Sequence, residues 1–120
     1  MKLITIVNAN NVINGFADKE DIGAHLAYWF TKFVVKTQDE VTFFQTEMRK
    51  LFDKYGVKGE DGALSVPGEN AAAFAQEADK LQNTEVQDPE IRFSLSEISA
   101  ELRVSLKQMY PLLDFINENE

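Results

Sequence analysis

The fold is decided by residues 18–56, which read DKEDIGAHLAYWFTKFVVKTQDEVTFFQTEMRKLFDKYG. Apolar side chains recur there at steps of three and four residues, the spacing of one helical face, with a gap at Thr37. This main stripe consists of Ile22, Leu26, Trp29, Phe33, Val41, Phe44, Met48, Leu51 and Tyr55. Asp18 is a favourable N-cap, and Gly56 stands where a left-handed C-terminal cap belongs. The pattern predicts one amphipathic helix about 55 Å long.

A second set of apolar side chains lies beside the main stripe, namely Phe30, Val34, Val35 and Phe43. A helix this long outruns the core of a small protein, so we expect part of it to pair with a partner. Large aromatic side chains dominate the energetics of protein interfaces. We therefore predict that the partner-binding anchors are Trp29, Phe30, Phe33 and Phe44. The alternative is that all four belong to the core, and for Phe33 and Phe44 the core is the favoured interpretation.

The segment after the long helix predicts a turn and a second helix. Residues 57–66 hold two short apolar pieces around Asp61 and Gly62, a pattern typical of a β-hairpin. Pro67 and Gly68 then break the chain before an alanine-rich helix, whose apolar face is expected to contain Ala71, Phe74, Ala78 and Leu81. Because the connection is compact, we expect the two helices to pack as an antiparallel hairpin.

Two short strands and a final helix complete the prediction. Residues 3–7 (LITIV) are rich in β-branched side chains and residues 91–95 (IRFSL) alternate, so we expect these two segments to pair. Ser105 and Gln108 fit a capping box at the start of a short helix bent by Pro111. The expected apolar face of that helix is Leu106, Met109, Tyr110, Leu113 and Ile116.

The predicted fold is therefore mainly α, within the α+β class. It is a long antiparallel helical hairpin with a small β element formed by the N-terminal and C-terminal short strands. With 120 residues, the chain has the length of one ordinary domain, so we expect a single domain over residues 1–120.

Composition narrows the classes of function. The formal net charge is −8, which disfavours direct binding to the phosphates of nucleic acids. Cysteine is absent, which removes disulfides, thiolate zinc sites and cysteine nucleophiles. The apolar run at residues 3–7 is too short for a signal peptide or a membrane span. We expect a protein of the cytoplasm that does not bind membranes.

The sequence lacks the common motifs for catalysis and cofactor binding. His25 is the only histidine, and no serine or cysteine stands in a nucleophile motif beside it. The carboxylates Asp39, Glu40 and Glu47 lack the Glu-x-x-His pairs of di-metal bundles, and residues 59–62 lack the ligand spacing of a calcium loop. Phosphate-binding glycine loops do not occur. We expect a non-enzymatic protein without a catalytic residue, a metal site or a cofactor.

Acidic residues suggest a second way of binding. A contiguous acidic surface could imitate nucleic acid and occupy the basic groove of another protein, and salt would weaken such binding steeply. The candidates for that surface are Asp39, Glu40, Glu47, Glu77, Asp79, Glu85 and Asp88.

Several helix ends and turns, taken in order, resemble a known family. They are FDKYG at 52–56, EDG at 60–62, VP at 66–67, the strand at Phe93 and LLDFI at 112–116. This order is similar to that of small DUF1617-like proteins from phages and prophages of Gram-positive bacteria, over most of the chain after about Asp18. The resemblance implies viral origin, a non-enzymatic role and expression inside an infected bacterium, with no catalytic residues to transfer.

Two functions follow as expectations. The first is a phage accessory protein, either an assembly factor or a minor virion component, that binds another protein through the long helix and forms a helix-mediated homodimer. The alternative is an acidic inhibitor of a host defence system, of the anti-CRISPR or nucleic-acid-mimic type. The expected partner is a phage structural protein or a host defence protein, and the expected location is the host cytoplasm or the virion.

Overall fold

The computed structural model of the chain describes residues 1–117, and it is mainly helical, with 65% of residues in helices. In chain order the elements are α1 (Leu3–Asn14), α2 (Ala24–Tyr55), β1 (Val57–Lys58), β2 (Leu64–Ser65), α3 (Gly68–Gln82), β3 (Phe93–Ser94), α4 (Leu95–Glu101), α5 (Leu106–Met109), the 3₁₀ helix η1 (Tyr110–Phe115) and β4 (Ile116–Asn117). None of the helices within residues 1–117 is both long enough and apolar enough to cross a membrane.

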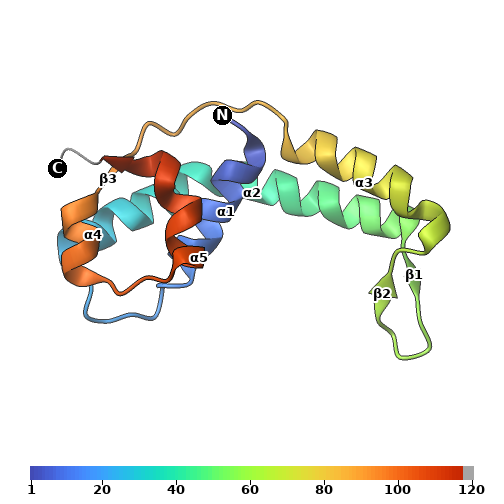
Figure 1. The fold of residues 1–120 in the computed structure, drawn as a ribbon, viewed down its shortest axis with the longest axis horizontal. Coiled ribbons are helices and arrows are strands. Elements are labelled where there is room, and N and C mark those ends of the chain that lie inside the picture. The colour runs from blue at the N-terminus through green and yellow to red at the C-terminus, as the bar shows by residue number, and fades with distance from the viewer. Residues whose placement is uncertain (118–120) are drawn as a thin grey trace.

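Helix α2 runs along the whole molecule, which measures 49 × 32 × 24 Å (Figure 1). Its 32 residues span about 48 Å at 1.5 Å per residue, close to the longest dimension. Its N-terminal half packs with α1 and the C-terminal elements α4, α5 and η1 in what we call the body. Its C-terminal part, beyond the contact of Val41 and Phe44 with α1, packs with α3 in what we call the arm, and the β1–β2 hairpin lies at the far end of the arm.

The core of the body is built from side chains of α1, α2 and the segment after residue 90. Aromatic rings join these parts, with Phe33 4.9 Å from Phe115 and Phe30 5.0 Å from Phe93, centroid to centroid. Such edge-to-face pairs add to the gain from burial. The buried members are Ile6, Ala9, Ile13, Leu26, Phe30, Phe33, Ile91, Phe93, Ile98, Leu102, Leu112 and Phe115.

Residues 3–7 are the first turns of α1, so the predicted N-terminal strand is wrong. The buried positions of α1 follow helical spacing only when Asn10, a polar residue, is counted among them. Asn10 is 2% exposed and donates from Nδ2 to Oγ1 of Thr37 at 3.0 Å. Because Asn10 is polar, the sequence does not show it as part of the apolar face of a helix. Burial in the tertiary structure also outweighed the β propensity of the isoleucine and valine side chains.

The β elements are correspondingly rearranged. β3 pairs in parallel with β4, so its partner is the C-terminal end of the chain and not residues 3–7. The N-terminal segment contributes only an isolated bridge between Lys2 and Glu85. The predicted hairpin around Asp61 is present as antiparallel β1 and β2, with Gly62 at φ +80°, a conformation that glycine adopts without strain.

Helix α2 has its N-terminal cap five residues later than the predicted N-cap at Asp18. Its N-cap is Gly23, which has no side chain to cap the helix, and the Gly23 N–H donates instead to Oε1 of Glu101 at 2.9 Å. A carboxylate from the end of α4 therefore replaces the expected local cap. At the other end Gly56 does stop the helix, but in an extended conformation and not the left-handed one that we predicted.

In the arm, α3 runs antiparallel to α2, as predicted for the alanine-rich helix (Figure 1). Near the hairpin, Nδ2 of Asn70 donates to the carbonyl of Tyr55, and the Phe74 and Phe52 rings lie 5.0 Å apart. The other end of α3 approaches the body, where Leu81 packs beside the buried Val41. The helical hairpin thus involves only half of α2, because the other half belongs to the body.

Candidate protein-binding surfaces

A cleft of about 410 Å³ lies between the N-terminal half of α2 and the loop that joins α1 to α2. The loop leaves α1 through successive tight turns, with the Phe16 N–H donating to the Ile13 carbonyl and the Lys19 N–H to the Phe16 carbonyl. These turns bring the Phe16 ring into a stacked arrangement with the Phe30 ring, with the ring centroids 6.2 Å apart, and both residues line the cleft. The cleft is lined by Ile13, Asn14, Phe16, Ala17, Lys19, Glu20, Ile22, Ala27, Phe30, Thr31, Val34 and Val35.

Val35 stands at the edge of this cleft and is 68% exposed. Its neighbour Val34 is half-buried against the core. The four residues predicted as a second apolar set therefore lie in different places. Phe30 is in the core, and Val34 and Val35 line the cleft. Phe43 is exposed further along α2. An apolar cleft with a few polar groups is the usual form of a binding site.

The four predicted anchors do not form one surface. Phe33 is fully buried and Phe30 is 5% exposed, so both contribute mainly to the core. Phe44 is half-buried against Leu3, Val7 and Val41. Trp29 is partly exposed and lies on the other side of α2 from the cleft, where it lines a smaller hollow of about 240 Å³.

That smaller hollow contains the only histidine. The Nδ1 atom of His25 lies 2.8 Å from Oε1 of Glu97, and Arg92 and Ser94 line the same hollow. The Ser94 hydroxyl accepts from the Glu97 N–H and lies 2.9 Å from the Ser96 hydroxyl. Over residues 1–117, no hydrogen bond joins His25 to a hydroxyl group, and no three potential metal ligands come together.

The predicted acidic surface is partly neutralised within the chain. Four of its seven members form ion pairs: Glu47 with Lys50, Glu77 with Lys54, Glu85 with the Met1 ammonium group and Asp88 with Arg92. Among the described residues, Asp39, Glu40 and Asp79 have no ion-pair partner. Asp39 and Glu40 lie on α2, and Asp79 lies on α3.

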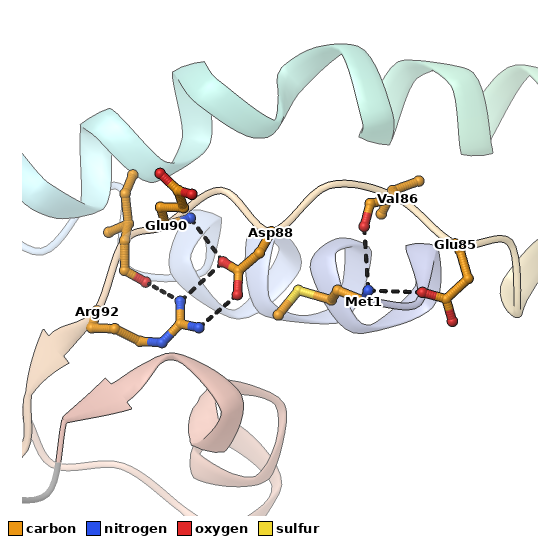
Figure 2. A network of polar contacts seen from close by, with 7 residues as sticks. Met1, Glu85, Val86, Asp88, Glu90 and Arg92 are labelled. Carbon is orange, nitrogen blue, oxygen red and sulfur yellow. Dashed lines mark hydrogen bonds and ion pairs between the residues drawn. The ribbon is translucent and has the colours of Figure 1, made fainter.

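Figure 2 shows how the segment between α3 and β3 is held by two of these pairs. The Met1 ammonium group donates to Oε2 of Glu85 at 2.9 Å and to the Val86 carbonyl at 3.2 Å. The Asp88 carboxylate accepts two bonds from Arg92 at 2.6 and 3.1 Å and one from the Glu90 N–H at 2.8 Å. The Arg92 hydrogen bonds, helped by that N–H, lower the pKa of Asp88 to about 2 against the opposing effect of burial.

A second apolar surface lies on α5 and η1. The capping box predicted at its start is confirmed, with Ser105 and Gln108 exchanging both bonds. Three members of the expected apolar face, Leu106, Tyr110 and Leu113, are exposed to solvent. We call these three side chains the C-terminal stripe.

The buried side chains of this segment are Leu112 and Phe115 instead. A switch from an α to a 3₁₀ helix at Tyr110 changes the period from 3.6 to about 3.0 residues, and it rotates residues 112 and 115 toward the core. In the sequence, the only sign of this switch is Pro111 directly after Tyr110. A helical wheel drawn with one constant period cannot represent a change of period at that point.

No family model, curated protein or solved structure matches the chain. The resemblance to DUF1617-like phage proteins therefore stays a prediction from the sequence.

Proposed function

We propose that this chain is a non-enzymatic phage accessory protein that binds another protein through α2, as an assembly factor or a minor virion component. The observation that carries the proposal is the apolar cleft of about 410 Å³ against α2, with the exposed Val35 at its edge. The resemblance of the turns and helix ends to phage proteins supports the viral setting, in the host cytoplasm or the virion.

The chemistry of the cleft indicates what the partner supplies. Phe16 and Phe30 contribute stacked rings to the lining of the cleft, and Ile22 and Val34 contribute aliphatic side chains. A hollow of this kind suits a large apolar side chain, the type of residue that dominates protein interfaces. Of the two charged residues that line the cleft, Lys19 is already paired with Asp21 at 3.0 Å, which leaves Glu20, so the interaction depends mainly on apolar contact. Binding of this kind is little affected by salt.

The alternative function is the acidic inhibitor of a host defence system. Asp39 and Glu40, adjacent on α2 and without ion pairs among the described residues, are the observation that favours it. Four of the other carboxylates are already neutralised inside the chain, which leaves less free charge for a basic groove. This function predicts binding that salt abolishes.

A pull-down with matched variants tests both functions. C-terminally tagged wild type, Val35→Lys, Phe43→Lys and Asp39→Lys are each incubated with lysates of infected and uninfected bacteria at low and high salt. Phe43 is the control because it is an exposed apolar residue of α2 that does not line the cleft.

The proposal predicts that a phage structural protein is retained at high salt, lost with Val35→Lys and kept with Phe43→Lys. A host defence protein that is released by salt, bound equally by both variants and lost with Asp39→Lys would establish the alternative instead. Equal capture of the same phage protein by wild type and Val35→Lys would exclude the cleft as its binding site.

A further inference from the structure

The C-terminal stripe is the most exposed group of neighbouring large apolar side chains on the described part of the molecule. Leu106 is 90% exposed, Tyr110 is 78% exposed and Leu113 is 52% exposed. The steps of four and three residues bring them onto one side of the α5–η1 segment. Adjacent exposed apolar residues of this size mark an interaction surface, whereas single ones do not.

A groove of about 330 Å³ runs beside the stripe, between α1 and η1. The groove is lined from α1 by Ile4, Thr5 and Asn8, and from η1 by Tyr110, Pro111, Leu113 and Asp114. Leu106 does not line this groove, although it is the most exposed large apolar residue of the described chain. The same segment thus presents both a protruding leucine and, beside it, a groove with apolar and polar lining.

The geometry points to a homodimer in which two copies of this chain pack their C-terminal stripes antiparallel, with Leu106 of each copy in the groove of the other. A twofold interface uses the same patch on both subunits. A patch that holds both a protruding side chain and a groove can therefore make the same contact twice, once from each copy. The axis would pass near Tyr110 and Pro111, the middle of the segment. This dimer is independent of the α2 cleft and of the partner proposed for it.

The charges at the two ends of the stripe favour a second copy of this chain as the partner that covers the stripe and its groove. Lys107 lies at one end and Asp114 at the other, and no ion pair within residues 1–117 includes either. Asp114 exerts only a longer-range attraction on Arg92. An antiparallel arrangement brings Lys107 of one copy opposite Asp114 of the other, and the symmetry repeats the contact. The patch is therefore complementary to itself in charge as well as in shape.

The total surface area leaves room for such an interface. The chain exposes 7,993 Å², whereas a compact monomer of 13.6 kDa exposes about 6,600 Å². A standard interface hides about 800 Å² from each partner. The chain can therefore lose the area of one ordinary interface and still expose as much surface as a compact protein of its mass.

Sedimentation velocity over a range of protein concentrations tests the dimer. We expect wild type to shift from monomer to dimer with concentration, and Leu106→Lys to raise the dissociation constant about tenfold or more. Val35→Lys is the matched control, since it places the same charge at another exposed aliphatic position and should leave the dimer unchanged. Circular dichroism of each variant checks that the fold is kept.

A charge reversal makes the test specific for the antiparallel arrangement. Lys107→Glu and Asp114→Lys should each weaken the dimer, and the double variant should recover it, because the pair is restored with opposite polarity. A wild-type protein that remains monomeric up to its solubility limit would overturn the proposal. So would a dimer that is unaffected by Leu106→Lys.

The two proposals fail separately. Leu106→Lys should capture the α2 partner as wild type does, while Val35→Lys should lose the partner and keep the dimer. If Val35→Lys instead keeps the partner, the function assigned to the cleft is wrong and the dimer still stands.

Discussion

Asn10 and Thr37 are the buried polar side chains of the body, and they are bonded to one another. Asn10 Nδ2 donates to Oγ1 of Thr37, Thr37 Oγ1 donates to the Phe33 carbonyl at 2.7 Å, and Asn14 donates to Oδ1 of Asn10. A buried polar group costs little when it is satisfied and much when it loses its partner. This chain of bonds fixes the position of α1 along α2, because a shift by one turn would separate the pair.

We predict that Thr37→Val lowers the free energy of unfolding by about 1–3 kcal/mol, since Asn10 Nδ2 would stay buried without its acceptor. Urea unfolding measures the change. Thr31→Val is the control, because the Thr31 hydroxyl also donates to a carbonyl one turn back but is exposed. Equal losses in the two variants would show that the hydroxyl-to-carbonyl bond matters and that the pairing with Asn10 does not.

The ion pair between Asp88 and Arg92 makes the stability of the fold depend on pH. Its pKa is lowered from 3.8 to about 2 in the folded protein, so its pair with Arg92 stabilises the fold fully above pH 3.8. That stabilisation is lost as the pH falls from 3.8 through 2. Both side chains are partly exposed, so we expect about 1 kcal/mol or less. The difference in unfolding free energy between wild type and Asp88→Asn should be constant near neutrality, should shrink as the pH falls below 3.8, and should disappear only below about pH 2. A difference that keeps its neutral-pH size below pH 2 would assign the effect to packing.

At the scale of the element, α2 begins with a cap supplied by another helix. Glu101 accepts from the Gly23 N–H, where the positive end of the helix dipole favours a carboxylate. A Cβ atom at Gly23 would collide with Oε1 of Glu101, so Gly23→Ala must displace the carboxylate. We predict that Gly23→Ala destabilises the protein by about 1 kcal/mol, and that Glu101→Ala does the same. In the double variant the costs should not add, because each change removes the same bond. Additive losses in urea unfolding would contradict this.

The elements also show what could be read from the sequence. The hairpin at Asp61 and the capping box at Ser105 depend on a few adjacent residues, and both are present. The strand at residues 3–7 was wrong because the helical pattern of α1 runs through Asn10, which is explained only by Thr37 on another helix. The N-terminus of α2 was misplaced for the same reason, since its capping carboxylate lies 78 residues away along the chain.

The binding surfaces were harder to predict than the fold. Trp29 and Phe30 are adjacent on one amphipathic helix, and sequence spacing placed Trp29 on the buried stripe and Phe30 beside it. In the structure Phe30 is core and Trp29 is partly exposed, because α1 and the Phe93 strand cover a face that is centred slightly differently. Which apolar residues remain uncovered depends on where the rest of the chain packs.

At the scale of the whole molecule, the body and the arm differ in how much they bury. The radius of gyration is 17.0 Å, against about 14 Å for a compact chain of this length, because the arm is only two helices thick. In α3 only Ala78 is buried, and the rings of Phe52, Tyr55 and Phe74 are all half-buried. The body, in contrast, contains the fully buried Phe33 and Phe115. The arm therefore buries less apolar surface per residue than the body does.

We predict that the arm opens without the body. In hydrogen exchange followed by mass spectrometry, amides of α3 and residues 48–55 should exchange faster than those of α1 and residues 26–37, because local opening costs less where less apolar surface is exposed. Phe74→Ala should accelerate exchange in the arm alone, since its ring contacts only Phe52 and Tyr55 among the aromatic residues described. Phe93→Ala is the matched control, and it should accelerate exchange in the body and not in the arm, because its ring packs against Phe30 and Phe33. If Phe74→Ala accelerated exchange in the body to the same extent, the arm and the body would unfold as a single unit and the long helix would couple the two ends of the molecule.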